Sequence, residues 1–133
     1  MQEKELPAVM ALSYLGDAVY SLYVRERLVK LGISHAGELN RLSLSFVTAP
    51  KQAELAKKLL PLLTDEETGI YRRAFNHKGL SRPAHASYGE YRAATGFEAV
   101  LGALHHIGDR ARLNYLLDTI HKNEFNAKED IPK

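Results

Sequence analysis

Two carboxylates lie alone in otherwise apolar stretches of the chain. Residues Ala11–Val24 contain one acidic side chain, Asp17, and residues Ala93–Leu104 contain one, Glu98. No lysine or arginine lies one helical turn from either acid, so neither can form a salt bridge along its own helix. An isolated carboxylate in a buried helix is costly unless it is protonated, paired with a distant cation or bound to a metal ion.

One arrangement would satisfy both acids. If their two helices cross with Asp17 facing Glu98, a divalent cation can sit between the carboxylates. Mg²⁺ prefers hard oxygen ligands and binds through one or two carboxylates plus water and substrate phosphates, and Mn²⁺ can substitute for it. Such a site can activate water and neutralise charge on a phosphodiester. Small residues beside both acids would let backbones or a substrate strand come close: Gly16 and Ala18, Gly96 and Ala99.

A purely structural role for the two acids is the alternative. Tyrosine hydroxyls could donate to Asp17, and Arg72, Arg73 or Arg92 could pair with Glu98. His105 and His106 are adjacent and point about 100° apart on a helix, so we assign them to packing or to the surface.

The same residues carry a resemblance to a known family. Ser13–Val19, Ser-Tyr-Leu-Gly-Asp-Ala-Val, resembles the ribonuclease III signature, whose core is an acid followed by Phe-Leu-Gly-Asp-Ala-Val. Gly96–Ala103 resembles that family's second motif, Asp-x-Phe-Glu-Ala-x-x-Gly-Ala. The two segments come in the family's order, about 80 residues apart, and the resemblance covers nearly the whole chain.

The departures from that pattern indicate one branch of the family. The ribonuclease III pattern has Glu in place of Ser13 and Asp in place of Thr95, and it usually continues into a double-stranded-RNA-binding domain. Both differences, together with Tyr91–Ala99, resemble the short bacterial branch, Mini-ribonuclease III. So does the pattern formed by Arg72, Arg73, Asn76 and Lys78.

The resemblance implies a metal-dependent endoribonuclease that cleaves double-stranded RNA, leaves 5′-phosphate ends and matures the 23S ribosomal RNA precursor. Asp17 would be the principal metal ligand and Glu98 its partner. Ser13 and Thr95 each lie about one turn before an acid and would hold metal-bound water. A large-subunit ribosomal protein is a possible further partner, and no other cofactor is expected.

The substrate-gripping residues are expected after the fourth helix. Arg72, Arg73, Lys78 and Arg82 gather there, and His77 and His85 could contribute when protonated. A-form RNA is recognised mainly through phosphates and 2′-hydroxyls, which requires cations along a groove. A solvated basic turn is the alternative interpretation of this segment.

A homodimer is expected because cutting a duplex requires two sites, and closed two-fold dimers supply them. The first helix is also too apolar to be covered by one small bundle. Two other classes of function remain open. One is a non-catalytic RNA-binding or ribosome-assembly factor that has kept the fold, which the absence of acids at Ser13 and Thr95 would favour. The other is a helical protein-interaction module, which would leave both lone acids unexplained.

The secondary-structure elements that carry these residues are all predicted to be α-helices. The fold class is all-α, a bundle of about six helices, with residues 1–133 forming a single ribonuclease III-like catalytic domain. Ser34, Thr48 and Asp109 are the expected caps of three helices, and Thr64 with Glu67 and Ser87 with Glu90 form two capping boxes. Helices are expected at about residues 6–31, 34–47, 48–60, 64–75, 87–107 and 109–120, a loop at 76–86 and a frayed tail from about 126 to 133.

Composition restricts the class of protein further. The 133 residues are 45% hydrophobic and 26% charged, as in ordinary globular domains. There is no cysteine, which excludes disulfides and thiolate metal sites and fits a cytoplasmic protein. Asp17 interrupts the longest apolar stretch, Val9–Val24, which makes it marginal for crossing a membrane. A net charge of +2 is too small to indicate RNA binding, so any RNA-binding cations must be concentrated on one surface.

Overall fold

The computed structural model describes residues 6–80 and 85–131, and these form an all-helical bundle, as predicted. The α-helices are α1 (Val9–Lys30), α2 (Ala36–Val47), α3 (Ala49–Leu59), α4 (Asp65–Phe75), α5 (Tyr88–His106) and α6 (Arg110–Ile120). Two short 3₁₀ helices, η2 (Leu60–Leu62) and η3 (Lys128–Asp130), complete the described elements. No helix among the described residues is both long enough and apolar enough to cross a membrane.

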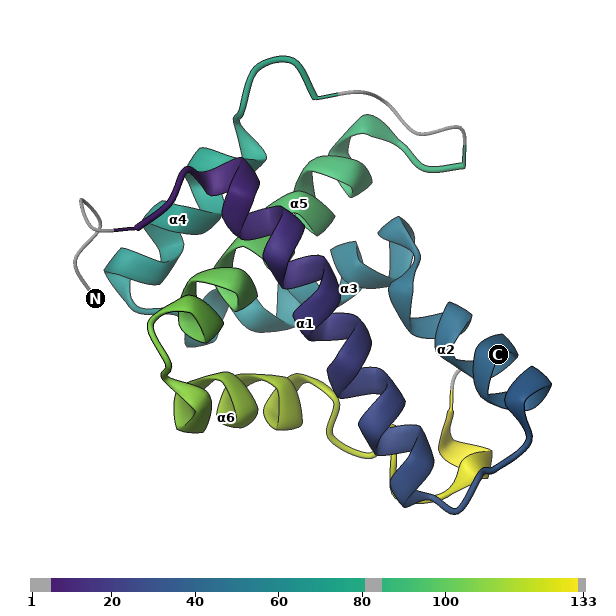
Figure 1. Cartoon of the computed structure of the whole chain (residues 1–133). Coiled ribbons are helices and arrows are strands. Elements are labelled where there is room, and N and C mark those ends of the chain that lie inside the picture. The colour runs from purple at the N-terminus through teal and green to yellow at the C-terminus, as the bar shows by residue number, and fades with distance from the viewer. Residues whose placement is uncertain (1–5, 81–84, 132–133) are drawn as a thin grey trace.

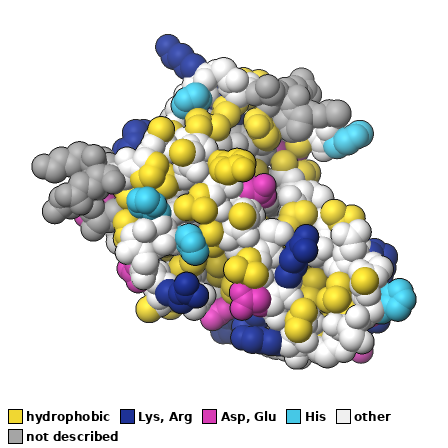
Figure 2. Space-filling model, in the orientation of Figure 1, with side chains coloured by type: hydrophobic (Ala, Val, Ile, Leu, Met, Phe, Trp, Pro, Cys, Tyr) yellow, Lys and Arg dark blue, Asp and Glu magenta, His cyan; other side chains and the backbone are white. Residues whose placement is uncertain are grey.

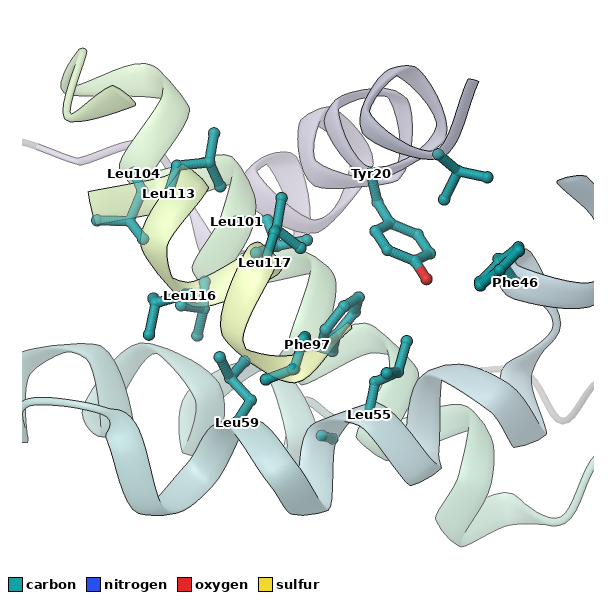
Figure 3. Packing of buried hydrophobic residues seen from close by; sticks show 14 of the residues in the cluster. Tyr20, Phe46, Leu55, Leu59, Phe97, Leu101, Leu104, Leu113, Leu116 and Leu117 are labelled. Carbon is teal, nitrogen blue, oxygen red and sulfur yellow. The ribbon is translucent and has the colours of Figure 1, made fainter. Parts of the chain in front are cut away.

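Helix α5 is the centre of the bundle, because α1, α3, α4 and α6 all pack against it (Figure 1). Its apolar side chains enter the core from several sides. Phe97 is fully buried and lies near Leu55 and Leu59 of α3, while Leu101 lies near Leu117 of α6 (Figure 3). A helix that is apolar on most faces must be buried in this way, and burial on most sides makes an acid such as Glu98 unusual.

The helix boundaries follow local side-chain chemistry closely. Both predicted capping boxes form: Thr64 Oγ1 accepts from Glu67 N at 3.2 Å, and Ser87 Oγ accepts from Glu90 N at 3.0 Å. Thr48 and Asp109 also cap their helices as predicted. The predicted cap Ser34 is wrong, because the N-cap of α2 is His35, which makes no side-chain capping bond. Helix α1 begins at Val9, after Pro7, instead of at residue 6.

The expected frayed tail is instead packed as far as it is described. Phe125 is 4% exposed and Ile131 is 5% exposed, and both belong to the core. A buried polar network lies just before this tail: Tyr20 Oη lies 3.2 Å from Nε2 of His121, whose Nδ1 lies 3.1 Å from Glu124. Lys51 Nζ donates to Glu124 at 2.7 Å. Within the tail, Lys128 Nζ donates to Glu38 at 2.5 Å. The C-terminal segment is therefore part of the folded domain through residue 131.

Candidate metal centre and RNA-facing residues

The crossing of α1 and α5 is unusually close because two glycines face each other there. A Cβ atom added to Gly16 would lie 1.7 Å from the backbone oxygen of Glu98, and one added to Gly102 would lie 1.9 Å from that of Leu12. No side chain can occupy such a space. The crossing therefore places backbone atoms of α1 against the turn of α5 that carries Glu98, and Asp17 follows Gly16 directly.

This crossing brings the two lone acids together. Asp17 is exposed, Glu98 is half-buried, and the two carboxyl groups share a hydrogen bond. Burial and the neighbouring Asp17 carboxylate raise the pKa of Glu98 to about 8. At neutral pH Glu98 is then mostly protonated, and its O–H group can donate to Asp17. Two carboxyl groups that lie close together in a partly buried site share a proton in this way.

The other groups around Glu98 are uncharged hydrogen-bonding side chains. Ser13 is 6% exposed, and its hydroxyl donates to Glu98 Oε1 over a long 3.4 Å. Gln52 of α3 is buried and helps to lower the pKa of Glu98, against the larger effects of burial and Asp17, which raise it. Among the described residues, the largest influences on the pKa of Glu98 come from burial, Asp17, Ser13 and Gln52, and none of these is a cation.

Three of the side chains that the sequence offered as structural partners of the acids contact other groups. Arg92 donates to the backbone oxygen of Phe75 at 2.6 Å and covers the Tyr88 ring. The hydroxyl of Tyr20 meets His121, and that of Tyr23 donates to Asp118 at 2.7 Å. Neither the arginine nor the two tyrosines therefore account for the acid pair.

Thr95 has a different environment from the one expected. Its side chain is 3% exposed, and its hydroxyl donates to the backbone oxygen of Tyr91 at 2.9 Å. Its proton is thus used within α5, and only its lone pairs remain for a water molecule. Gly96, expected to allow close approach beside the acids, instead accommodates the Tyr71 ring of α4, whose atoms would lie 2.7 Å from an added Cβ.

The donor set at the crossing fits a magnesium ion. Its atoms are all oxygens: the Asp17 and Glu98 carboxylates and the Ser13 hydroxyl. Gln52 of α3 is also buried, and among the described residues its side-chain oxygen has no hydrogen-bond partner. Sequence reasoning missed Gln52, because a glutamine on a short amphipathic helix reads as a surface residue. Across the described ranges, no three His, Cys, Asp or Glu side chains cluster as metal ligands, so two carboxylates would be completed by water and phosphate.

The basic residues proposed to face RNA are only partly described. Arg72 and Arg73 are exposed in the last turn of α4, Lys78 is exposed just after it, and Arg82 lies outside the described residues. Figure 1 shows residues 76–80, which follow α4, extending beyond the bundle. Tyr88 of α5 donates to the Leu80 backbone oxygen at 2.9 Å, which fastens one side of this segment.

Comparison with known proteins agrees with this geometry. A sequence model of the ribonuclease III domain matches residues 10–108, a range that contains both acids. The chain therefore belongs to the ribonuclease III family and is an endoribonuclease.

Individual relatives show to which branch of the ribonuclease III family the chain belongs. The chain is 43% identical over 108 residues to a Mini-ribonuclease 3 of Symbiobacterium thermophilum, covering 81% of this chain and 83% of that protein. It is 39% identical over 111 residues to a Mini-ribonuclease 3 of Enterococcus faecalis, covering 82% and 84%. A crystal structure of a Fusobacterium nucleatum protein has the same fold, with a TM-score of 0.83, 25% identity, and coverage of 93% of this chain and 95% of that one. Within the family, the chain falls in the Mini-ribonuclease 3 branch.

Proposed function

We propose that this endoribonuclease cleaves double-stranded RNA in a magnesium-dependent reaction, as a homodimer, and that its substrate is the 23S ribosomal RNA precursor. The observation that supports the metal dependence is the pairing of exposed Asp17 with Glu98, whose pKa has no cation among its largest influences within the described residues. The substrate assignment rests on the resemblance to Mini-ribonuclease III.

Each residue at the crossing has a distinct part in this proposal. Bound Mg²⁺ would supply a more acidic water and neutralise charge on the phosphodiester. Asp17 offers a solvent-facing carboxylate as the principal ligand, while half-buried Glu98 offers a second one that must first lose its proton. Ser13 keeps a hydroxyl against Glu98 and can orient either the carboxylate or a water. Arg72, Arg73, Lys78 and Arg82 would hold the RNA phosphates.

The exposed face of α1 supports the homodimer. Ala11, Tyr14, Ala18, Leu22 and Val29 recur at helical spacing and are all exposed, Tyr14 by 85% and Val29 by 59%. Figure 2 shows hydrophobic side chains following the diagonal course of α1 across the surface. Exposed apolar patches of this kind indicate an interface. A two-fold dimer through this stripe would place two sites across a duplex, one for each strand.

Cleavage of duplex RNA tests the proposal. Wild type is expected to cut a duplex stem in Mg²⁺ or Mn²⁺ and to be inactive in a chelator. Asp17→Asn should abolish cleavage while retaining helical content and RNA binding. Glu26→Gln, at an exposed acid on the same helix, is the matched control and should cut normally. Full activity of Asp17→Asn would refute the metal assignment, and cutting of single-stranded RNA alone would refute the substrate.

A further inference from the structure

A short basic turn follows α4, and two side chains of α5 hold its ends. Residues 76–80 form this turn, in which His77 and Lys78 are exposed and Leu80 is buried. Gly79 has a φ of +88°, a backbone conformation that favours glycine. The two basic side chains therefore lie between the end of a helix and a residue anchored by burial.

The first end of the turn is held by Arg92. Its Nη1 donates to the backbone oxygen of Phe75 at 2.6 Å. Carbonyl groups in the last turn of a helix lack partners within the helix and form its negative end, so a guanidinium suits them in both respects. Hydrogen bonds from a charged donor are also stronger than neutral ones. This bond joins α5 to the residue directly before the turn.

The second end is held by Tyr88, which lies one helical turn before Arg92 on the same face of α5. The Tyr88 hydroxyl donates to the backbone oxygen of Leu80 at 2.9 Å. The Arg92 guanidinium lies over the Tyr88 ring, with Cζ 4.5 Å from the ring centroid, which is a favourable cation–π distance. Tyr88 is 39% exposed, so burial of its ring does not explain this arrangement. Each side chain supports the other, and each binds one end of the turn.

We infer that Tyr88 and Arg92 form a clamp that fixes residues 76–80 and so presents Lys78 to the phosphates of the RNA. This inference rests on the proposed RNA-facing role of the basic residues after α4. A side chain already held in its bound position needs no ordering when the ligand arrives, and the apparent affinity rises with the fraction of molecules in that position. Tyr88 and Arg92 are thus positioning residues that act on RNA through Lys78.

The test measures binding of a duplex RNA stem to the full chain in a chelator, where no cleavage is expected, together with thermal unfolding. Tyr88→Phe keeps the ring beneath Arg92 but loses the bond to Leu80, and it should weaken binding about 3-fold. Arg92→Met loses a charged hydrogen bond, and it should weaken binding about 10-fold. Arg92→Lys keeps a cationic donor and should recover part of that loss.

Tyr115 of α6 offers a matched control. It is an exposed tyrosine whose ring lies beneath another arginine, Arg112, with Cζ 5.6 Å from the centroid. Tyr115→Phe removes a hydroxyl from a similar pair on a different helix. It should bind the duplex as wild type does.

A double-mutant cycle with Lys78 separates positioning from direct contact with RNA. If the clamp acts through Lys78, both Tyr88→Phe and Arg92→Met should weaken binding much less in a Lys78→Ala protein than in wild type. Equal losses in the two backgrounds would show that these side chains contact RNA themselves, and would overturn the inference.

The remaining outcomes are also decisive. Wild-type affinity in folded Tyr88→Phe and Arg92→Met proteins would overturn the inference. Failure of both variants to fold would assign the contacts to stability and overturn it too. If Lys78→Ala binds as wild type does while Arg72→Ala binds more weakly, the RNA-facing assignment survives and the clamp fails. If wild type itself does not bind duplex RNA, the proposed function fails, whatever the variants do.

Discussion

Replacing Gly16 with alanine is the sharpest test of the α1–α5 crossing. The added Cβ would lie 1.7 Å from the backbone oxygen of Glu98, whereas real Cβ atoms stay beyond 3.0 Å. A backbone oxygen cannot rotate away as a side chain can, so the two helices must separate by more than an ångström. That movement would pull Asp17 away from Glu98.

The magnitude follows from two opposing effects. Alanine is a better helix former than glycine by about 0.5–1 kcal/mol, while overpacking a tight contact costs about 1–3 kcal/mol. We expect net destabilisation of about 1–2 kcal/mol, read as a fall of several degrees in the unfolding temperature. Activity should fall much further, roughly 100-fold, because Mg²⁺ tolerates little displacement of its ligands and catalysis depends on position at the 1 Å scale.

Gly89→Ala supplies the control in α5. Nothing lies within 4 Å of a Cβ added at Gly89, so this variant should be as stable as wild type or slightly more stable, and fully active. The assays are thermal unfolding and cleavage of a duplex stem. If Gly16→Ala proves as stable and as active as Gly89→Ala, the close crossing does not hold the acids in place.

Four further predictions follow from the same contacts. Asp17→Asn should raise the unfolding temperature of the metal-free protein at pH 8. Burial and the Asp17 carboxylate both raise the pKa of Glu98, and the substitution removes the repulsion between the two carboxylates. A lower unfolding temperature would show that the pair stabilises the fold. Although burial opposes it, hydrogen bonds from His121 and Lys51 lower the pKa of Glu124 to about 2. After a discount for solvent screening, Glu124 contributes on the order of 2 kcal/mol to the free energy of unfolding, complete above about pH 5 and lost as the pH falls toward 2; acid titration of Glu124→Gln should show a shallower loss of stability, and an unchanged curve would contradict this. Leu22→Arg should produce monomers in light scattering, whereas Leu44→Arg, at an equally exposed leucine on α2, should not. Arg72→Ala should reduce the dependence of RNA affinity on log salt by about one; an identical salt dependence would remove Arg72 from the interface.

The sequence predicted most of the features that one residue or one turn decides, with the cap at Ser34 as an exception. The two capping boxes depend on residues three apart, and the predicted ends of α3, α4 and α5 lie within about two residues of the observed ones. Asp17 and Glu98 were recognisable because a lone acid in an apolar run contradicts its surroundings. Their meeting in the structure also explains why Gly16 precedes Asp17.

What the sequence did not reveal depends on contacts between distant segments. Gln52 looks like a surface residue until α3 packs against α5. The polar composition after Phe125 predicts fraying, but Ile131 reaches the core and His121 connects to Tyr20 of α1. Thr95 was expected to hold metal-bound water. Its hydroxyl donates to the Tyr91 oxygen instead, and that bond depends on a side-chain rotamer that residue spacing cannot specify.

The most direct test of the shared cation is a crystal structure of the protein with Mn²⁺, examined by anomalous scattering. We predict one strong peak between the carboxylates of Asp17 and Glu98. Mn²⁺ bound elsewhere, or two carboxyl groups that remain hydrogen-bonded to each other at saturating Mn²⁺, would contradict it.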